Sequence, residues 1–182
     1  LIVSNINYED LIIGDKNCVL LAARILGYGK DYKFTYNGEE QTVDLSQLNN
    51  KTLNKELFKK GTNEFTFTLP FSLRKVTFKI LDHKDELNIE RALKGYAKIN
   101  KNNRPEMSTR MKTMIISIDG NYDKTEVNSF VDNQLLAREG RELRKYIKEI
   151  QPDVLSTFTY TNNDGMDEEI DLPIAANFFY PD

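Results

Sequence analysis

The chain has 182 residues, of which 40% are hydrophobic and 29% are charged, with 25 Lys and Arg against 28 Asp and Glu. This composition is typical of a globular protein, and 9 Tyr and 10 Phe are enough aromatic residues to fill a core, which excludes global disorder. A formal charge of −3 and a pI near 5.4 argue against general affinity for nucleic acid or for an anionic membrane. No apolar run is long enough to cross a bilayer.

Cysteine and histidine each occur once. Cys18 alone excludes an internal disulfide framework, and His83 leaves too few ligands for a structural zinc site. We therefore expect an intracellular, soluble protein with no metal and no cofactor. The sequence begins at Leu1 rather than Met, so a missing short leader is an open alternative.

The first 60 residues predict two helices and a hairpin. A short helix over 9–13 is expected to end at Gly14, and a second helix is expected to begin after Asp15 and to end at Gly27 and Gly29. The second helix has a predicted buried stripe of Cys18, Leu21, Ala22 and Ile25, with Cys18 as a small core residue. Residues 32–36 and 41–45 alternate on either side of Asn37-Gly38, which indicates a β-hairpin. A polar connection with some helix follows over 46–60.

The middle of the chain changes from strand to helix periodicity. Residues 65–69 and 75–81 predict two strands that pair, and residues 82–98 predict a helix. After a polar, basic loop over 100–104, Pro105 is expected to open a helix that continues to Asp119-Gly120. The side of that helix is predicted to carry Met107, Met111, Met114, Ile115 and Ile118.

The last third predicts two helices and a second hairpin. Asp123 and Glu126 have capping-box spacing before a stripe of Val127, Phe130, Val131 and Leu135. The next helix is expected to run to Ile150 with Leu136, Leu143, Ile147 and Ile150 facing inward. Residues 157–160 and 168–172 predict a hairpin, so the fold class is α+β, with a helical middle flanked by β-hairpins near both ends. We expect a single domain over 1–182, with 1–81 (mixed α/β) and 82–182 (helices plus C-terminal hairpin) as its sub-units.

The two hairpins have similar sequences. Phe34-Thr35-Tyr36 is echoed by Phe158-Thr159-Tyr160, and the segment ending Val43-Asp44-Leu45 is echoed by Ile170-Asp171-Leu172. Duplication and chance similarity between hairpins both explain the echo. In either case, we expect the two hairpins to pack beside each other.

The residues that could support catalysis lack the spacing of known catalytic motifs. His83 lies in a charged helix start and is interpreted as a solvated surface residue. The carboxylates near residues 82–86 and 167–171 do not have the spacing of a calcium loop, and no phosphate-binding loop or serine nucleophile motif is present. We therefore expect that the protein is not an enzyme.

The best defined charged feature lies on the helix that is predicted to end at Ile150. Arg138, Arg141, Lys145 and Lys148 recur on one helix face, and Arg144 flanks it. One interpretation is a solvated face paired with Glu139, Glu142 and Glu149. The other is a docking face for an acidic partner, either another subunit or the chain's own C-terminal segment. Beyond Asn163 that segment has no Lys or Arg, and its acidic residues are Asp164, Asp167, Glu168, Glu169, Asp171 and Asp182.

The aromatic tail is a second candidate for recognition. Side chains alternate in an extended chain, so Phe178, Phe179 and Tyr180 cannot all face one side. We expect Phe178 and Tyr180 to close the domain and Phe179 to be available to a neighbouring subunit.

Several short motifs occur in a recognisable order along nearly the whole chain. They are Gly14-Asp15, Leu20-Leu21, Arg24-Ile25-Leu26, Tyr28-Gly29 and Tyr32, then Thr68-Leu69-Pro70, Ile118-Asp119-Gly120, Ala137-Arg138-Glu139, Leu143-Arg144-Lys145-Tyr146, Leu172-Pro173 and Phe178-Phe179-Tyr180-Pro181. This ordered set resembles the baseplate hub and tail-assembly proteins of T4-like bacteriophages. The resemblance implies a non-enzymatic late protein of the virion that builds the central hub of a contractile-tail baseplate, after assembly in the host cytoplasm.

The resemblance is incomplete in the two hairpins. Members of that family often carry Cys-x-x-Cys pairs there, which suggests a zinc site. In this chain those places hold Tyr36, Asn37 and Gly38, and Tyr160, Asn163 and Gly165. The resemblance then implies two knuckles in which aromatic packing and tight turns replace the metal.

The expected partners are other baseplate hub or tail proteins, with a homo-oligomer as an open alternative and with no nucleic acid and no membrane. A role in the mature virion and a role as an assembly chaperone both fit the sequence. The alternative function is a nucleic-acid-binding module that uses the basic helix 138–148, against which the acidic pI and the lack of interleaved aromatic residues count.

Overall fold

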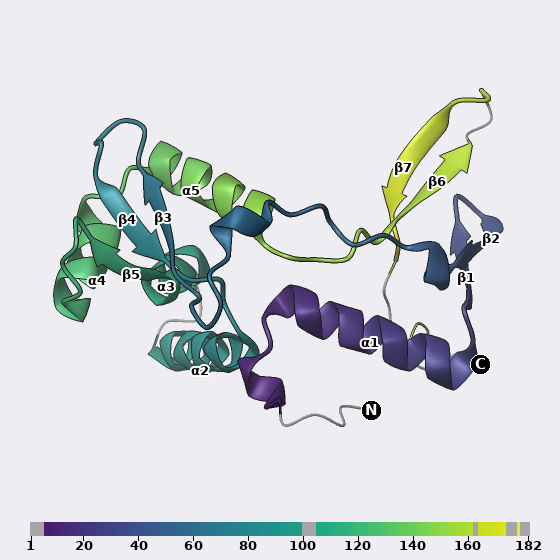
Figure 1. The fold of residues 1–182 in the computed structure, drawn as a ribbon, viewed down its shortest axis with the longest axis horizontal. Helices are drawn as coiled ribbons and strands as arrows, with labels where there is room; N and C mark the ends of the chain where they lie inside the picture. The colour runs from purple at the N-terminus through teal and green to yellow at the C-terminus, as the bar shows by residue number, and fades with distance from the viewer. Residues whose placement is uncertain (1–5, 100–104, 162–163, 174–177, 179–182) are drawn as a thin grey trace. The chain divides into compact units, whose positions relative to one another are not determined.

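The computed structural model describes residues 6–99, 105–161, 164–173 and 178, and its fold class is α+β, as predicted (Figure 1). The chain forms two compact units. Unit 1 consists of residues 1–5, 14–52 and 152–182, and unit 2 consists of residues 6–13 and 53–151. The sheets of the described residues are antiparallel throughout.

This division replaces the expected one between residues 81 and 82. The two central strands of the chain pair with each other and with a third strand at residues 115–118, so they belong to unit 2. The C-terminal hairpin packs on the N-terminal hairpin instead of joining the helices. Pairing between segments far apart in sequence therefore sets the division, and a single cut in the chain cannot reproduce it.

Unit 1 contains two hairpins and one long helix. The first hairpin pairs β1 (Asp31–Tyr36) with β2 (Glu39–Asp44), and the second pairs β6 (Thr157–Thr161) with β7 (Asp167–Asp171). Asn37 and Gly38 have φ values of 50° and 84°, which is the tight left-handed turn that their sequence predicts. Both predicted hairpins are confirmed. A 3-10 turn at Leu45–Gln47 follows β2.

The hairpins pack together through their aromatic residues. The ring centroids of Phe34 and Phe158 lie 5.0 Å apart, and those of Tyr36 and Tyr160 also lie 5.0 Å apart. Both pairs meet edge to face, the favourable arrangement of aromatic quadrupoles. The expectation that the hairpins lie beside each other is therefore confirmed.

The register of the two hairpins refines the sequence echo. Leu45 N–H donates to the Lys30 carbonyl, and Leu172 N–H donates to the Ser156 carbonyl, each at 2.8 Å. Aligned by these two hydrogen bonds, Tyr32 corresponds to Phe158. In the sequence echo, Phe158 corresponds instead to Phe34, two residues later. A shift of two residues keeps side chains on the same face of a strand, so both alignments direct aromatic rings to the shared core.

The N-terminal helix begins earlier than predicted. A 3-10 turn covers Tyr8–Asp10, and α1 runs over Ile13–Tyr28, so Gly14 lies in the first turn of α1 and the helix expected to end there is absent. Gly29, with φ 84°, follows the helix and donates its N–H to the Ile25 carbonyl, as predicted.

The buried side of α1 also differs from the predicted stripe. Leu21 and Ile25 pack against the aromatic cluster of unit 1, while Ala22 is exposed and Arg24 is buried. The Arg24 guanidinium bonds the Gly29 carbonyl and lies over the Tyr28 ring, so its charge is partly satisfied within the helix end. Cys18 is half-buried.

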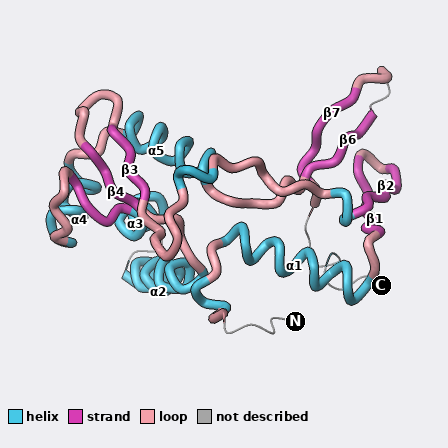
Figure 2. Tube along the Cα trace, in the orientation of Figure 1, coloured by secondary structure: helices cyan, strands magenta, loops and turns pink. Residues whose placement is uncertain are grey.

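Among the described residues, unit 2 combines a three-stranded sheet with four α-helices. Figure 2 colours its strands magenta and its helices cyan. The sheet has the order β3 (Phe65–Thr68), β4 (Lys75–Phe78) and β5 (Ile115–Ile118), and a 3-10 turn at Lys55–Leu57 precedes it. The helices are α2 (His83–Ile99), α3 (Glu106–Met114), α4 (Lys124–Asn133) and α5 (Ala137–Ile150).

Strand β5 corrects the prediction of one helix over 105–118. Helix α3 ends at Met114, and the next four residues form β5, in which Ile115, Ser117 and Ile118 pair with β4 across a shift of register. Three of these four residues are isoleucine, whose β-branched side chain favours a strand. Pairing with β5 satisfies backbone N–H and C=O groups on the edge of β4. These groups would be left unpaired if residues 115–118 continued the helix.

The core of unit 2 lies between the sheet and the helices. Its fully buried members include Leu69, Val76, Phe78, Ile115, Val127 and Leu143, together with Ile147 and Ile150 near the end of α5. Asp123 caps α4 by accepting from Thr125 N–H and Glu126 N–H, as its spacing predicts. Leu136, expected to face inward, is exposed because it precedes the first turn of α5.

Two glycines of α1 give a matched test of backbone packing within unit 1. A Cβ on Gly14 would lie 1.8 Å from the Pro152 carbonyl oxygen, whereas a Cβ on Gly27 would meet no atom within 4 Å. We expect Gly14→Ala to lower the free energy of unfolding by about 1–3 kcal/mol because backbone must move. Gly27→Ala should raise it by about 0.5–1 kcal/mol because alanine favours the helix. Urea denaturation of both variants measures the difference, and equal stability of the two would contradict the close approach at Gly14.

Candidate functional site

The basic residues predicted as a partner-binding face all lie on α5. Arg138, Arg141, Lys145 and Lys148 are exposed, and Arg144 is half-buried. Leu143, Ile147 and Ile150 face the core from the opposite side of the helix. The binding of a partner to this face stays a prediction.

The surroundings of these residues divide them into two groups. The Arg138 guanidinium lies 3.6 Å from the centroid of the Phe71 ring, in the turn between β3 and β4. Arg144 and Lys148 instead line a groove between α2, α3 and α5. The face predicted from the helical spacing therefore borders two different surface features.

The groove has a volume of about 620 Å³ and an apolar floor that includes Leu81, Met111, Met114 and Ile147. Arg110, on its wall, bonds both carboxylate oxygens of Glu86, at 2.6 and 2.9 Å, and also pairs with Glu106. These contacts raise the pKa of Arg110 and neutralise that wall internally.

The turn between β3 and β4 presents two large apolar side chains to solvent. Phe71 is 51% exposed and Leu73 is 73% exposed. Leu73 has φ 56°, in the left-handed region that a leucine rarely adopts and that costs about 1–2 kcal/mol. We call residues 70–74, with these two side chains, the apolar turn.

A buried carboxylate holds the apolar turn. Glu139 is fully buried, and its Oε1 accepts the backbone N–H groups of Phe71, at 3.2 Å, and Ser72, at 2.6 Å. Among the described residues, its Oε2 has no hydrogen-bond partner. Burial raises the pKa of Glu139, but the hydrogen bonds from Ser72 and Phe71 outweigh it and hold the pKa below its ordinary value.

A second carboxylate holds the strand that leaves the turn. Asp119, with φ 51°, accepts from Arg74 Nε at 2.8 Å and from Lys75 N–H at 2.7 Å. The bond from Arg74 lowers the pKa of Asp119, which keeps the carboxylate ionised. Arg74 also lies over the Phe130 ring. The apolar turn is thus fixed by charged groups from α5 and from the end of β5.

Sequence reasoning missed Glu139 as a buried residue and treated it as a surface ion partner. The signal was present, because Glu139 lies four residues before Leu143 and eight before Ile147, on the inward stripe of α5. An acidic residue on an apolar stripe indicates a buried acceptor, and the partner here is a turn 67–68 residues away in sequence.

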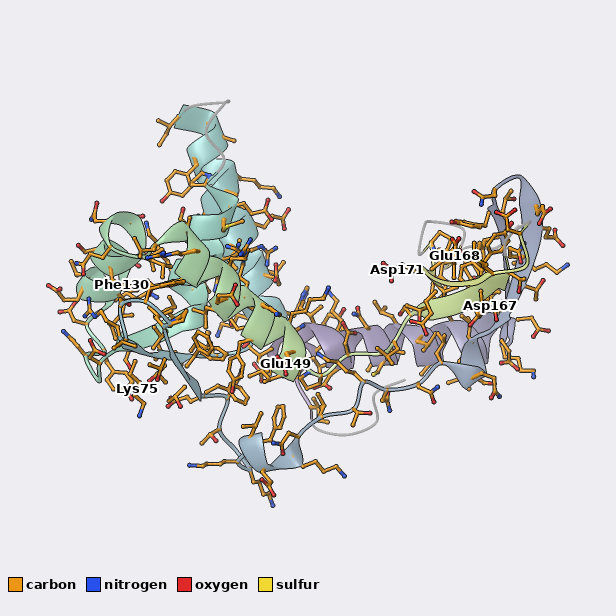
Figure 3. The ribbon with its side chains drawn as sticks, turned by 90° about the horizontal axis from the view of Figure 1, so that it is seen from above. Lys75, Phe130, Glu149, Asp167, Glu168 and Asp171 are labelled. Carbon is orange, nitrogen blue, oxygen red and sulfur yellow. The ribbon has the colours of Figure 1, made fainter. Side chains whose placement is uncertain are left out.

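The two units carry opposite formal charges. Unit 1 holds 5 of the 25 Lys and Arg residues and 12 of the 28 Asp and Glu residues, which gives −7. The other 20 basic and 16 acidic residues give unit 2 a charge of +4. Strand β7 is the most acidic part, with Asp167, Glu168, Glu169 and Asp171 all exposed. Figure 3 labels Asp167, Glu168 and Asp171.

The remaining candidate groups show no catalytic arrangement in the described residues. His83 is half-buried with its ring against Tyr8, so its interpretation as a solvated residue is corrected. Asp85 is buried and bonds Lys79 Nζ at 2.7 Å. Over the described ranges, no group of three His, Cys, Asp or Glu residues could hold a metal ion, and no helix is long and apolar enough to cross a membrane.

The aromatic tail is described at one position. Phe178 is 2% exposed, and its ring meets Tyr32 edge to face at 4.9 Å, in the cluster that joins the hairpins. Its predicted role in closing the fold is confirmed. Phe179, predicted to meet a partner, and Tyr180 lie outside the described residues.

Truncation of the Phe178 ring tests the aromatic cluster. We expect Phe178→Ala to lower the free energy of unfolding by about 3–5 kcal/mol, because it leaves a cavity beside Tyr32 and Phe34. Leu26→Ala, at an exposed position of α1 in the same unit, should change it by less than about 0.5 kcal/mol. Thermal denaturation followed by circular dichroism compares the two variants. An unchanged stability of Phe178→Ala would contradict the assignment of Phe178 to the core.

Replacement of Glu139 tests the buried acceptor. Glu139→Ala should destabilise the protein by about 1–3 kcal/mol, because two backbone donors lose their partner. Glu139→Gln keeps an acceptor oxygen and should be milder. A folded pKa below the ordinary value of 4.5 means that the ionised group adds stability above that pH and loses it as the pH falls through the folded pKa. Urea denaturation from about pH 7 to about pH 3 should show the wild-type advantage over Glu139→Gln shrinking with acid, and a constant advantage would contradict this assignment.

Comparison of the chain with protein-family models, with curated proteins and with solved structures found no match. The fold class and the surfaces above therefore rest on the chain's own sequence and geometry.

Proposed function

We propose that this chain is a non-enzymatic structural or assembly protein of the central baseplate hub of a contractile-tail bacteriophage, and that it acts through protein–protein contacts. Its partners are other hub or tail proteins, and its place of action is the virion, after assembly in the host cytoplasm. The proposal comes from the ordered motifs that resemble the hub and tail-assembly proteins of T4-like phages.

The observation that best supports the proposal is that residues of these motifs occupy positions with strict backbone requirements. Gly14 approaches the Pro152 carbonyl, and Gly29 and Gly120 have φ values above 80°. Asp119 holds Arg74 and Lys75, and the Tyr32 hydroxyl donates to the Pro173 carbonyl at 2.7 Å. These structural roles support treating the motif residues as one ordered set on which the resemblance rests.

The surfaces of unit 2 also favour protein contacts over chemistry. The groove has an apolar floor and a charged wall, and the apolar turn exposes Phe71 and Leu73. Aromatic residues and arginine are the residue types that dominate binding energy in protein interfaces. By contrast, Arg138 is stacked on Phe71 and Arg144 lines the groove, so the basic residues do not form one continuous track for a phosphate backbone.

Charge reversal on α5 tests the partner-binding role. We expect Arg141→Glu with Lys145→Glu to weaken assembly with purified hub proteins of the source phage at least tenfold, with strong dependence on salt, because both side chains are exposed. Arg91→Glu with Lys98→Glu makes the same change of charge at exposed positions of α2 and is the control. Size-exclusion chromatography with light scattering measures the complex, and circular dichroism checks the fold. Normal assembly of the α5 variant at low salt would contradict the partner-binding role and indicate that this face is only exposed to solvent.

A further inference from the structure

The apolar turn has features that the stability of the isolated fold does not require. Leu73 is more exposed than Phe71 and has a left-handed backbone conformation, a position at which glycine or asparagine would relieve strain. A leucine there gains little burial within the described residues. Strain and exposure at the same position indicate a role outside the fold of a single chain.

The turn is also held rigid before any partner arrives. Glu139 fixes two of its N–H groups, Asp119 fixes the strand that follows, and Arg138 covers one face of the Phe71 ring. Ordering a loop is one of the main costs of binding, so a loop that is already ordered binds more tightly than a mobile one.

The charge around the apolar turn indicates the chemistry of its partner. Lys75 and Arg138, both exposed, flank the turn, and within the described ranges neither forms an ion pair with a carboxylate. The matching surface must therefore combine carboxylates with an apolar contact.

The chain itself carries such a surface on its other unit. Strand β7 exposes Glu169 and Asp171, and Met166, beside its first residue, is 60% exposed. No Lys or Arg follows Lys148 in the sequence. Methionine is a flexible apolar side chain that adapts to aromatic and leucine neighbours.

We propose that the chain self-associates head to tail, with the apolar turn of unit 2 of one copy docked on strand β7 of unit 1 of a second copy. Phe71 and Leu73 contact Met166 of the second copy, and Lys75 and Arg138 pair with its Glu169 and Asp171. The opposite formal charges of the units, +4 and −7, attract copies in this orientation and repel like units. The contact joins different surfaces of the two copies, so it can close into a ring.

The small size of the two surfaces predicts a weak complex. A five-residue turn and one edge strand bury less than the roughly 1,200 Å² of a stable interface. The complex should therefore depend on concentration and, because ion pairs flank it, on salt.

The test uses the purified chain and two charge-reversal variants. The turn variant is Lys75→Glu with Arg138→Glu, and the strand variant is Glu169→Lys with Asp171→Lys. In light scattering from about 10 µM to about 1 mM at low salt, wild-type mass should rise above the monomer mass of 21.1 kDa and return to it at about 1 M salt. Each variant alone should remain monomeric, because its turn and its strand then carry charges of the same sign. An equimolar mixture of the two should recover the association, because the turn of each variant then meets a strand of opposite charge on the other.

A second pair of variants tests the apolar contact and guards against misfolding. Leu73→Asn should raise the melting temperature, because asparagine tolerates the left-handed conformation, and should weaken association at least tenfold. Ile99→Asn, at another exposed apolar position of unit 2, should leave association unchanged.

Three results would overturn the proposal. They are a monomeric wild-type chain over the whole concentration range, self-association that survives both charge reversals, and a mixture of variants that fails to recover it. If the wild-type chain is monomeric and the charge-reversal variants melt at a lower temperature than it does, the same residues belong to a contact within one chain. The purified chain answers these questions without hub proteins, so failure of the proposed hub function and failure of self-association are separate outcomes.

Discussion

Unit 1 depends on packing between two hairpins that are separated in the chain by the whole of residues 53–151. A two-stranded hairpin alone is marginally stable in water, because only one face can be covered and little apolar area is buried. Here the two hairpins bury aromatic rings against each other, and Phe178 and the α1 residues Leu21 and Ile25 pack against the same cluster. Aromatic burial thus stabilises a unit in which the two sheets of the described residues share no backbone pairing.

In unit 2, two carboxylates stabilise a strained connection between two strands. Its sheet is small, and the connection between β3 and β4 is a tight turn that contains a leucine in an unfavourable conformation. Glu139 from α5 accepts two N–H groups of this connection, and Asp119, just after β5, accepts the N–H of Lys75 at the start of β4. A buried carboxylate is unfavourable unless it is hydrogen-bonded, so this arrangement links the position of α5 to the shape of the turn.

Local signals in the sequence were sufficient for much of the fold. Asn37-Gly38 marked the first hairpin, Asp123 marked the start of α4, and the repeat of Leu143, Ile147 and Ile150 marked the inner side of α5. These features depend on a few neighbouring residues, and they agree with the structure.

The errors arose where distant segments decide the outcome. Strand β5 follows α3 without any turn residue to mark the boundary, and its isoleucines also fit the helical stripe, so pairing with β4 decides the outcome. Glu139 was treated as exposed because charged residues usually are, and its actual partners lie in a turn that is remote in sequence. The five basic residues were correctly grouped on one helix, but their division between the groove and the apolar turn depends on α2, α3 and the β3–β4 turn. The position of Phe179 lies outside the described residues.

The interleaved order of the units has a consequence for biosynthesis. Unit 2 is complete once residue 151 has left the ribosome, while unit 1 still lacks β6, β7 and Phe178. Until then, β1 exposes Tyr32, Phe34 and Tyr36, whose final neighbours have not yet emerged from the ribosome. The nascent chain therefore carries an open aromatic surface while residues 53–151 are synthesised, and this surface closes only when β6, β7 and Phe178 emerge. A ribosome that stops early would release a chain with a folded unit 2 and an exposed hairpin, a substrate for chaperones and proteases rather than a smaller working protein.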